Sequence, residues 1–107
     1  FNSNLLIPLY SNSIKSSFHL FLINLNFKKL KKNKDHFLKY LNSYKIFAQF
    51  HYIPIYKFNI YKEKKIKFPA SEVYYENTIS LPIYVSLSKL QQNRVIKIIK
   101  TYINLYK

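Results

Sequence analysis

The sequence predicts a small α+β domain, in which a few mainly antiparallel strands carry helices on one face. Short segments of alternating apolar residues at 18–27, 46–53 and 78–81 are typical of strands. An amphipathic segment at 88–107 is typical of a helix that packs on a sheet. The connections between these segments are short, and this order favours one layer of strands covered by helices.

The length of 107 residues bounds the protein to one domain with a modest core, since 49% of the residues are hydrophobic. The chain has no Cys, which excludes disulfides, thiolate metal sites and a Cys nucleophile and favours a cytoplasmic protein. The longest apolar run, residues 18–27, is interrupted by polar side chains and is shorter than the roughly 20 residues of a membrane-spanning helix. We therefore expect no membrane partner.

Gly and Met are both absent from the chain. Without Gly, the sequence cannot contain a phosphate-binding loop of the P-loop or Rossmann type, because those loops need left-handed turns and close backbone approach. A chain that begins with Phe1 and lacks both residue types is interpreted as part of a longer protein.

The formal net charge of +14 is compatible with a polyanionic partner such as nucleic acid. Lys, Asn, Ile and Tyr are all frequent, however, whereas Arg occurs only at Arg94. We interpret the charge as a compositional bias in which Lys fills exposed positions. The basic run at residues 28–34 is accordingly expected to be a solvated turn.

The first half of the chain is expected to hold a connector, a strand and a helix. Residues 1–17 show no clear period, and residues 18–27 then alternate as a strand does. Asn33 is a suitable N-cap for a helix that ends near Ser43. The apolar stripe of this helix consists of Phe37, Leu38, Leu41 and Tyr44.

Residues 46–53 are predicted to form the next strand, in which Gln49 and His51 share one face. We expect that face to look toward a ligand or a neighbouring domain. The stretch 56–68 that follows is charged and is expected to be irregular.

A short helix is predicted at residues 69–76, because proline suits the first turn, and its Val73 and Tyr74 are expected to face inward. Residues 78–81 form a short strand closed by Pro82. A capping box of the S-x-x-Q type then begins the last helix. The box residues are Ser88 and Gln91, and the apolar stripe of the helix is Val95, Ile98, Ile99, Tyr102, Ile103 and Tyr106.

Two proline phrases, residues 51–56 and 79–84, each run from an extended apolar stretch into a proline that ends it. Proline has a fixed φ and biases the preceding residue toward extended geometry. Both phrases are therefore expected to be strand ends that present aromatic and polar groups at loops, where binding residues are often found.

With these segments placed, the sequence resembles the C-terminal domain of the DegT/DnrJ/EryC1/StrS sugar aminotransferases, fold type I enzymes that use pyridoxal 5'-phosphate (PLP). The resemblance covers about residues 5–107 and consists of five landmarks in the same order. They are residues 16–21, 37–41, 49–56, 68–70 with Glu72 and Tyr75, and 79–84 followed by Leu87, Ser88, Gln92 and Val95. Within the family, the residues of the two proline phrases are most similar to those of the enzymes in the pseudaminic acid branch.

The resemblance implies that residues 1–15 are a connector from a large domain outside this chain and that residues 16–107 are the small C-terminal domain. In this family the Schiff-base Lys, the Asp beside the pyridine nitrogen and the phosphate site belong to the large domain. The chain is therefore expected to hold no catalytic or cofactor-binding residue and to be inactive alone. The implied reaction, in a homodimer, moves an amino group from glutamate to a 4-keto sugar carried on UDP.

The candidate substrate-binding residues are His51, Tyr52 and Tyr56. His51 is expected either to bond to the nucleotide sugar or the amino-donor carboxylate, or to be a partly buried His bonded to a backbone carbonyl. The two tyrosines could supply hydroxyls or a stacking face to uracil or sugar, and packing is the alternative. His19 is expected to orient the start of the first strand, and His36 to lie without a role on an exposed helix face.

The four acidic residues and three His show no spacing typical of a metal site or of an acid–base pair. Three hypotheses remain: part of a sugar aminotransferase, a small basic module that binds nucleic acid with a steep salt dependence, or an inactive gene remnant. The DNA upstream of Phe1 would separate the first from the third, because an open frame with a Schiff-base Lys identifies a parent enzyme.

Overall fold

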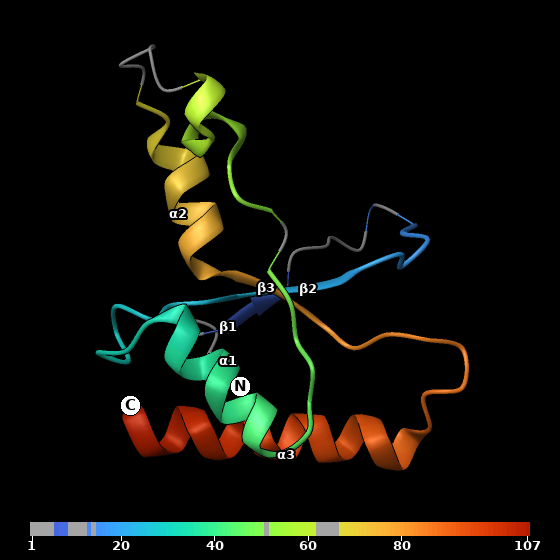
Figure 1. Cartoon of the computed structure of the whole chain (residues 1–107). Helices are drawn as coiled ribbons and strands as arrows, with labels where there is room; N and C mark the ends of the chain where they lie inside the picture. The colour runs from blue at the N-terminus through green and yellow to red at the C-terminus, as the bar shows by residue number, and fades with distance from the viewer. Residues whose placement is uncertain (1–5, 9–12, 14, 51, 62–66) are drawn as a thin grey trace.

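The structure is a computed structural model that describes residues 6–8, 13, 15–50, 52–61 and 67–107. Two strands begin the described part of the chain, and the third strand lies between the last two helices (Figure 1). The elements are strands β1 (Leu6–Pro8), β2 (Phe21–Leu25) and β3 (Thr78–Leu81), helices α1 (Lys34–Ser43), α2 (Pro69–Asn77) and α3 (Lys89–Tyr106), and 3-10 helices η1 (Ile55–Lys57) and η2 (Asn59–Tyr61). Within the described ranges, no helix has the length and apolar character needed to cross a bilayer.

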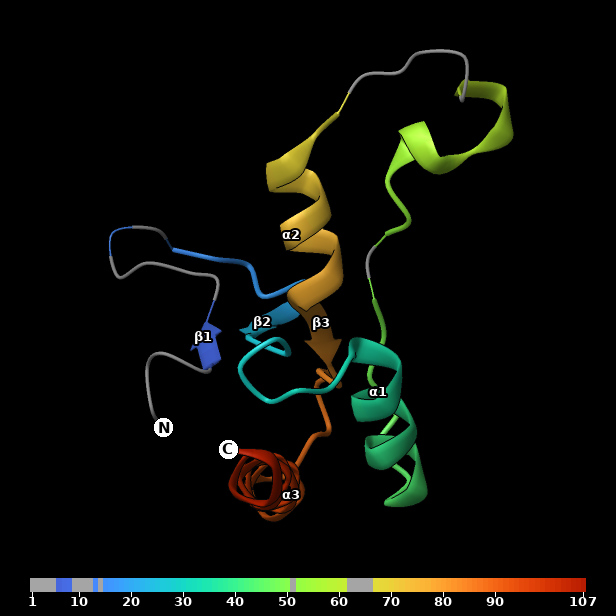
Figure 2. The ribbon, with the colours of Figure 1, turned by 90° about the vertical axis from the view of Figure 1, so that its left-hand side faces the viewer.

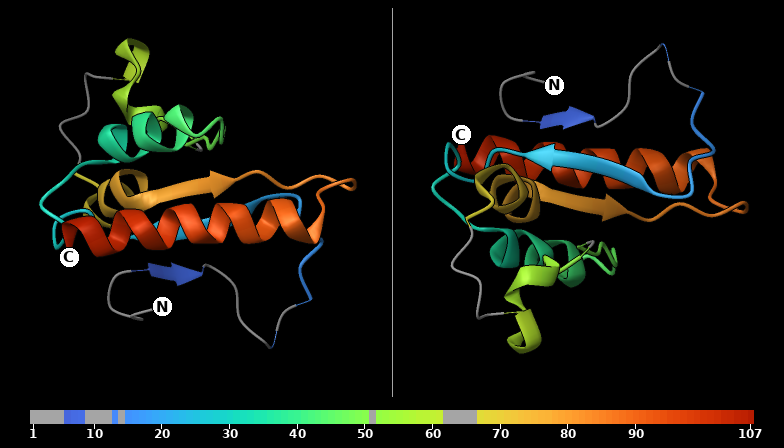
Figure 3. Two further views of the ribbon diagram at one scale, coloured as in Figure 1. Left: turned by 90° about the horizontal axis from the view of Figure 1, so that it is seen from below. Right: turned by 90° about the horizontal axis from the view of Figure 1, so that it is seen from above.

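The strands form one antiparallel sheet in the order β1-β2-β3, and Ile23 of β2 is paired with Ile79 of β3. Helices α1 and α3 lie on the same side of this sheet, and α3 runs along it (Figures 2 and 3). Helix α2 leads directly into β3 and extends away from the other two helices (Figure 1). The predicted α+β class with mainly antiparallel strands is confirmed.

The hydrophobic core lies between the sheet and helices α1 and α3. Alternation along β2 directs Ile23 and Leu25 into it, as the sequence pattern predicts. Its centre is aromatic, because the ring of Phe37 lies 4.6 Å from that of Tyr102 and 5.7 Å from that of Phe27. The buried apolar residues are Ile23, Leu25, Phe27, Leu30, Phe37, Leu41, Ile46, Ile79, Ile98, Ile99, Tyr102 and Ile103.

The beginnings of α1 and α3 agree with the caps predicted from sequence. The Asn33 side chain accepts a hydrogen bond of 2.8 Å from the amide of His36. At the start of α3, the Ser88 hydroxyl accepts from the Gln91 amide at 3.2 Å, and the Gln91 side chain accepts from the Ser88 amide at 2.8 Å. These bonds satisfy amides that have no partner within the helix.

Helix α1 ends in a Schellman motif with a lysine where glycine is usual. The amide of Ile46 donates to the carbonyl of Leu41 at 3.0 Å, and the amide of Lys45 donates to that of Asn42 at 2.8 Å. Lys45 has a φ of 57°, in the left-handed region that favours glycine.

Replacing Lys45 by glycine is expected to raise the free energy of unfolding by about 1 kcal/mol, because a residue with a Cβ pays about that much in this region. Urea unfolding of the 107-residue chain measures the change. Lys45→Ala is the matched control, since it removes the same side chain and keeps the Cβ. Equal stability of the two variants would show that backbone strain at this position is negligible.

The predicted strand at residues 46–53 is wrong. Among the described residues of this segment one bridge forms, in which Gln49 and Ser80 exchange backbone bonds of 3.0 and 2.7 Å. The next bonds of an antiparallel ladder would need the amides two residues away on β3. Pro82 has no amide hydrogen, and the amide of Thr78 already donates to a carbonyl of α2. These two features of β3 disfavour extension of the ladder on either side of Ser80.

The predicted inward face of α2 and the predicted exposure of His36 are also wrong. No residue of α2 is buried, and Val73 is 58% exposed, because this helix extends away from the sheet. His36 is half-buried, and its Nδ1 lies 2.8 Å from the hydroxyl of Tyr102. Helix α3 crosses that face of α1, a contact that local periodicity does not reveal.

Candidate functional site

A hollow of about 600 Å³ lies between the segment after position 51 and helix α2. We call it the tyrosine hollow. Its described lining is Tyr52, Pro54, Ile55, Tyr56, Phe68, Ala70, Ser71, Tyr74 and Tyr75. The lining is largely aromatic and contains no charged side chain, so it suits a flat, neutral group better than a small ion.

Local backbone chemistry brings the two walls of the hollow together. Pro54 ends the extended segment, and its carbonyl accepts from the amide of Lys57 at 2.9 Å to form η1. This tight turn directs Tyr56 toward α2. On the other wall Pro69 occupies the first turn of α2, where its missing amide hydrogen has no cost, and Phe68 immediately precedes it.

Tyr52 and Tyr56 differ in exposure. Tyr52 is 75% exposed and presents its ring at the surface of the hollow. Tyr56 is half-buried and stacks on Phe68, with ring centroids 4.7 Å apart and planes at 29°. Burial, together with the nearby Glu72 carboxylate, raises the pKa of Tyr56 to about 12, so its hydroxyl is protonated at neutral pH.

An ion pair stands beside the hollow. Lys57 Nζ lies 2.6 Å from Glu72 Oε2, and about a third of each side chain is exposed. The hydrogen bond to Glu72 raises the pKa of Lys57, and the same bond lowers the pKa of Glu72. Because the two charges compensate, this pair adds no net charge to the edge of the hollow.

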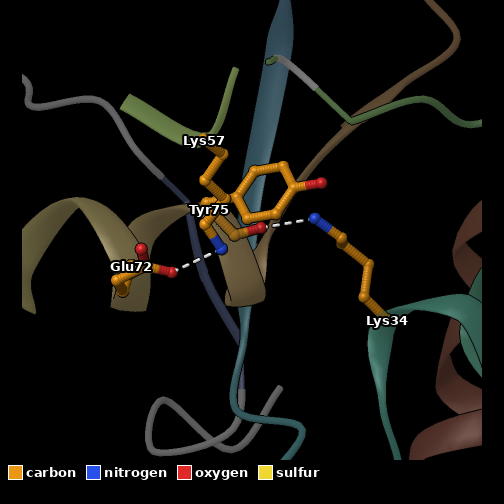
Figure 4. Close-up of polar contacts among 4 residues, drawn as sticks. All are labelled: Lys34, Lys57, Glu72 and Tyr75. Carbon is orange, nitrogen blue, oxygen red and sulfur yellow. Dashed lines mark hydrogen bonds and ion pairs between the residues drawn. The ribbon is translucent and has the colours of Figure 1, made fainter. Parts of the chain in front are cut away.

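A second lysine reaches the hollow wall from α1 (Figure 4). Lys34 is only 9% exposed, and its ammonium donates a hydrogen bond to the backbone carbonyl of Tyr75. The same Nζ lies 3.6 Å from the centroid of the Tyr75 ring and 4.8 Å from that of Phe50. Lys34 is therefore not part of a solvated turn, which corrects the interpretation of the basic run.

The three predicted site residues have different outcomes. His51 lies outside the described residues. Tyr52 and Tyr56 line the same hollow, so the structure brings them together. Sequence reasoning missed Phe68 and Lys34 as neighbours of this site. A proline after an aromatic residue was a usable signal for Phe68, whereas nothing in the sequence distinguished Lys34 from the exposed lysines around it.

The second proline phrase lies elsewhere. Leu81, Pro82 and Ile83 line an apolar hollow of about 470 Å³ at one end of the sheet. The other described residues around it are Phe18, Phe21, Leu87, Gln92, Val95 and Ile96. His19, next to this region, is exposed and precedes β2. The described residues of the two phrases thus line two different hollows.

Comparison with known proteins decides the family. Residues 2–100 match the DegT/DnrJ/EryC1/StrS aminotransferase family. The chain belongs to this family. Uncharacterized protein MJ1066 of Methanocaldococcus jannaschii is 33% identical over 88 residues, which are 78% of this chain and 23% of that protein. The spore coat polysaccharide biosynthesis protein SpsC of Bacillus subtilis is 27% identical over 101 residues, or 90% of this chain and 26% of SpsC.

Solved structures of aminotransferases have the same fold as this family member. PseC of Helicobacter pylori, an aminotransferase involved in the biosynthesis of pseudoaminic acid, has a TM-score of 0.78 at 30% identity, covering 94% of this chain and 28% of PseC. The PLP-form of Spr1654 from Streptococcus pneumoniae has a TM-score of 0.81 at 23% identity, covering 95% and 27%, and shows the fold alone. The chain spans about a quarter of the length of its curated relatives.

The family implies PLP, but the described lining of the tyrosine hollow does not fit this cofactor. A PLP site needs a lysine able to form an imine, a carboxylate beside the pyridine nitrogen and donors for the phosphate. The tyrosine hollow has none of these charged groups in its described lining. The two lysines beside it are engaged, Lys57 with Glu72 and Lys34 with Tyr75. No step of cofactor chemistry is therefore assigned to these residues.

Proposed function

We propose that the chain is the C-terminal part of a PLP-dependent aminotransferase that moves an amino group from glutamate to a 4-keto sugar carried on UDP. The family match over residues 2–100 carries this proposal. The chain spans about a quarter of the length of its relatives, and this length agrees with one domain of a larger enzyme. In this proposal residues 1–15 are the connector, residues 16–107 are the small domain, and PLP is held by the large domain of a cytoplasmic homodimer.

We further propose that the whole enzyme acts in pseudaminic acid biosynthesis, as a UDP-4-amino-4,6-dideoxy-N-acetyl-β-L-altrosamine transaminase. Two observations support this substrate. The residues of the two proline phrases are most similar to those of that branch of the family. The likeness to PseC covers 94% of the chain at 30% identity.

The share of this domain in the reaction is to bind and orient the nucleotide sugar. Tyr52 offers an exposed ring face for a uracil or sugar ring. Tyr56 is proposed to contribute the apolar surface of its ring to the same hollow, because it stacks on Phe68 and its hydroxyl is buried. His51, which precedes them in the chain, is proposed to bond to the same ligand. The apolar lining of the hollow would exclude water around the bound group.

Activity measurements test the proposal. The whole enzyme, incubated with glutamate and a UDP-linked 4-keto sugar, is expected to form 2-oxoglutarate and an amino sugar. The 107-residue chain alone is expected to show neither turnover nor an imine absorbance band with PLP, because the described lysines beside the hollow are engaged. A PLP adduct trapped by borohydride at one specific Lys of the chain would contradict this second expectation.

A further inference from the structure

Lys34 occupies a position that is unfavourable for its own helix. It is the first residue of α1, where the positive end of the helix dipole disfavours a cation. It is also 9% exposed, and this burial lowers its pKa, an effect that the neighbouring Asp35 opposes. A buried lysine at a helix N-terminus has a cost that other contacts must offset.

The direct contacts of the Lys34 ammonium come from Tyr75, which lines the tyrosine hollow, and from Phe50, which lies outside its described lining. The Lys34 ammonium donates to the carbonyl of Tyr75, in the last turn of α2, where the helix dipole favours a cation. It also lies against the rings of Tyr75 and Phe50, which themselves meet edge to face with centroids 6.1 Å apart. The same ammonium group thus caps the C-terminal end of α2 and contacts the ring of Phe50.

Through these contacts Lys34 joins α2 to Phe50, which precedes Tyr52 in the chain. Helix α2 has no buried residue, so packing contributes little to its direction. Tyr52 lines the opposite wall, and Phe50, two positions earlier in the sequence, follows Gln49, which is bonded to Ser80. Figure 4 shows Tyr75 between Lys34 and Lys57, and Lys57 continues the contacts to Glu72.

We propose that Lys34 is a positioning residue, which sets the separation of the two walls of the tyrosine hollow by joining the end of α2 to the segment that carries Tyr52. This inference deepens the proposed function and rests on it for the identity of the ligand. It assigns no contact with substrate to Lys34 itself.

The test replaces Lys34 by methionine, which keeps the length of the side chain and removes the charge and the donor. Hydrogen exchange of the whole protein is expected to be about tenfold faster in residues 52–57 and 69–77, and unchanged in α3. The dissociation constant for UDP is expected to rise about tenfold. Lys34→Arg is expected to restore most of both properties, because guanidinium keeps the charge, a donor and the cation–π contact.

Lys39→Met is the matched control, since Lys39 is exposed on the same helix and is expected to change neither quantity. Should Lys34→Met fail to fold, Phe50→Leu removes one of the two rings and leaves the lysine in place. It is expected to act in the same direction with a smaller effect.

The two readouts separate this inference from the proposed function. Exchange that is unchanged, or that rises equally in α3, would overturn a positioning role for Lys34. If hydrogen exchange rises in residues 52–57 and 69–77 while UDP affinity keeps the wild-type value, Lys34 does not determine the geometry of the binding site, and the proposal is overturned. A wild-type protein that does not bind UDP would contradict the proposed function, and the exchange data would still decide whether Lys34 organises the hollow.

Discussion

Replacing Phe37 by alanine is expected to lower the free energy of unfolding by about 3–5 kcal/mol, the largest effect on stability that we predict. Phe37 is fully buried, and its ring contacts both Phe27 from the sheet side and Tyr102 from α3. Removing the ring leaves a cavity where the sheet and two helices meet, and the surrounding side chains can fill it only in part. Urea unfolding of the 107-residue chain, followed by circular dichroism, measures the loss.

Val73→Ala is the informative comparison for this prediction. The sequence pattern placed Val73 inward on α2, whereas the structure leaves it 58% exposed. A substitution at such a position is expected to change stability by less than about 0.5 kcal/mol. If Val73→Ala cost as much as Phe37→Ala, the position of α2 relative to the core would be wrong.

Replacing Tyr52 by alanine is expected to weaken UDP binding by the whole enzyme roughly 10- to 100-fold. Stacking of a base on an aromatic side chain contributes about 1–3 kcal/mol, and Tyr52 has the most exposed ring among the tyrosines lining the hollow. Titration calorimetry with UDP measures the change. Tyr52→Phe keeps the ring face and is expected to bind UDP almost as well as the wild-type protein.

Tyr61→Ala provides the control for Tyr52. Tyr61 is also an exposed tyrosine, at 49%, and it does not line the tyrosine hollow. Its loss is expected to leave UDP affinity unchanged. Wild-type affinity in Tyr52→Ala would remove Tyr52 from the proposed binding site, whatever the activity of the enzyme.

Sequence signals were sufficient to predict features that depend on interactions between residues close in the chain. The N-caps at Asn33 and Ser88 satisfy helix amides through side chains only a few residues away, so both helix starts were predictable. The alternation of β2 and the long stripe of α3 were predictable because one buried face imposes its period on the residues.

The errors arose where a distant segment decides the outcome. The strand expected at 46–53 has a suitable pattern, but its partner β3 offers one usable position between Thr78 and Pro82. His36 was predicted to be exposed because the pattern of α1 alone does not show that α3 packs against it. In each case a residue more than 25 positions away sets the available hydrogen bonds or the burial, and a local period contains no information about it.

By itself, the sequence determined the fold class, the beginnings of the two best-defined helices, most of the core and the resemblance to the aminotransferase family that the comparison established. Only the tertiary structure decided that Tyr52 and Tyr56 share one hollow with α2, and that Lys34 is buried against its wall. The physical reason is that caps and periods are set by near neighbours, whereas a hollow is defined by the direction in which separate elements leave the sheet.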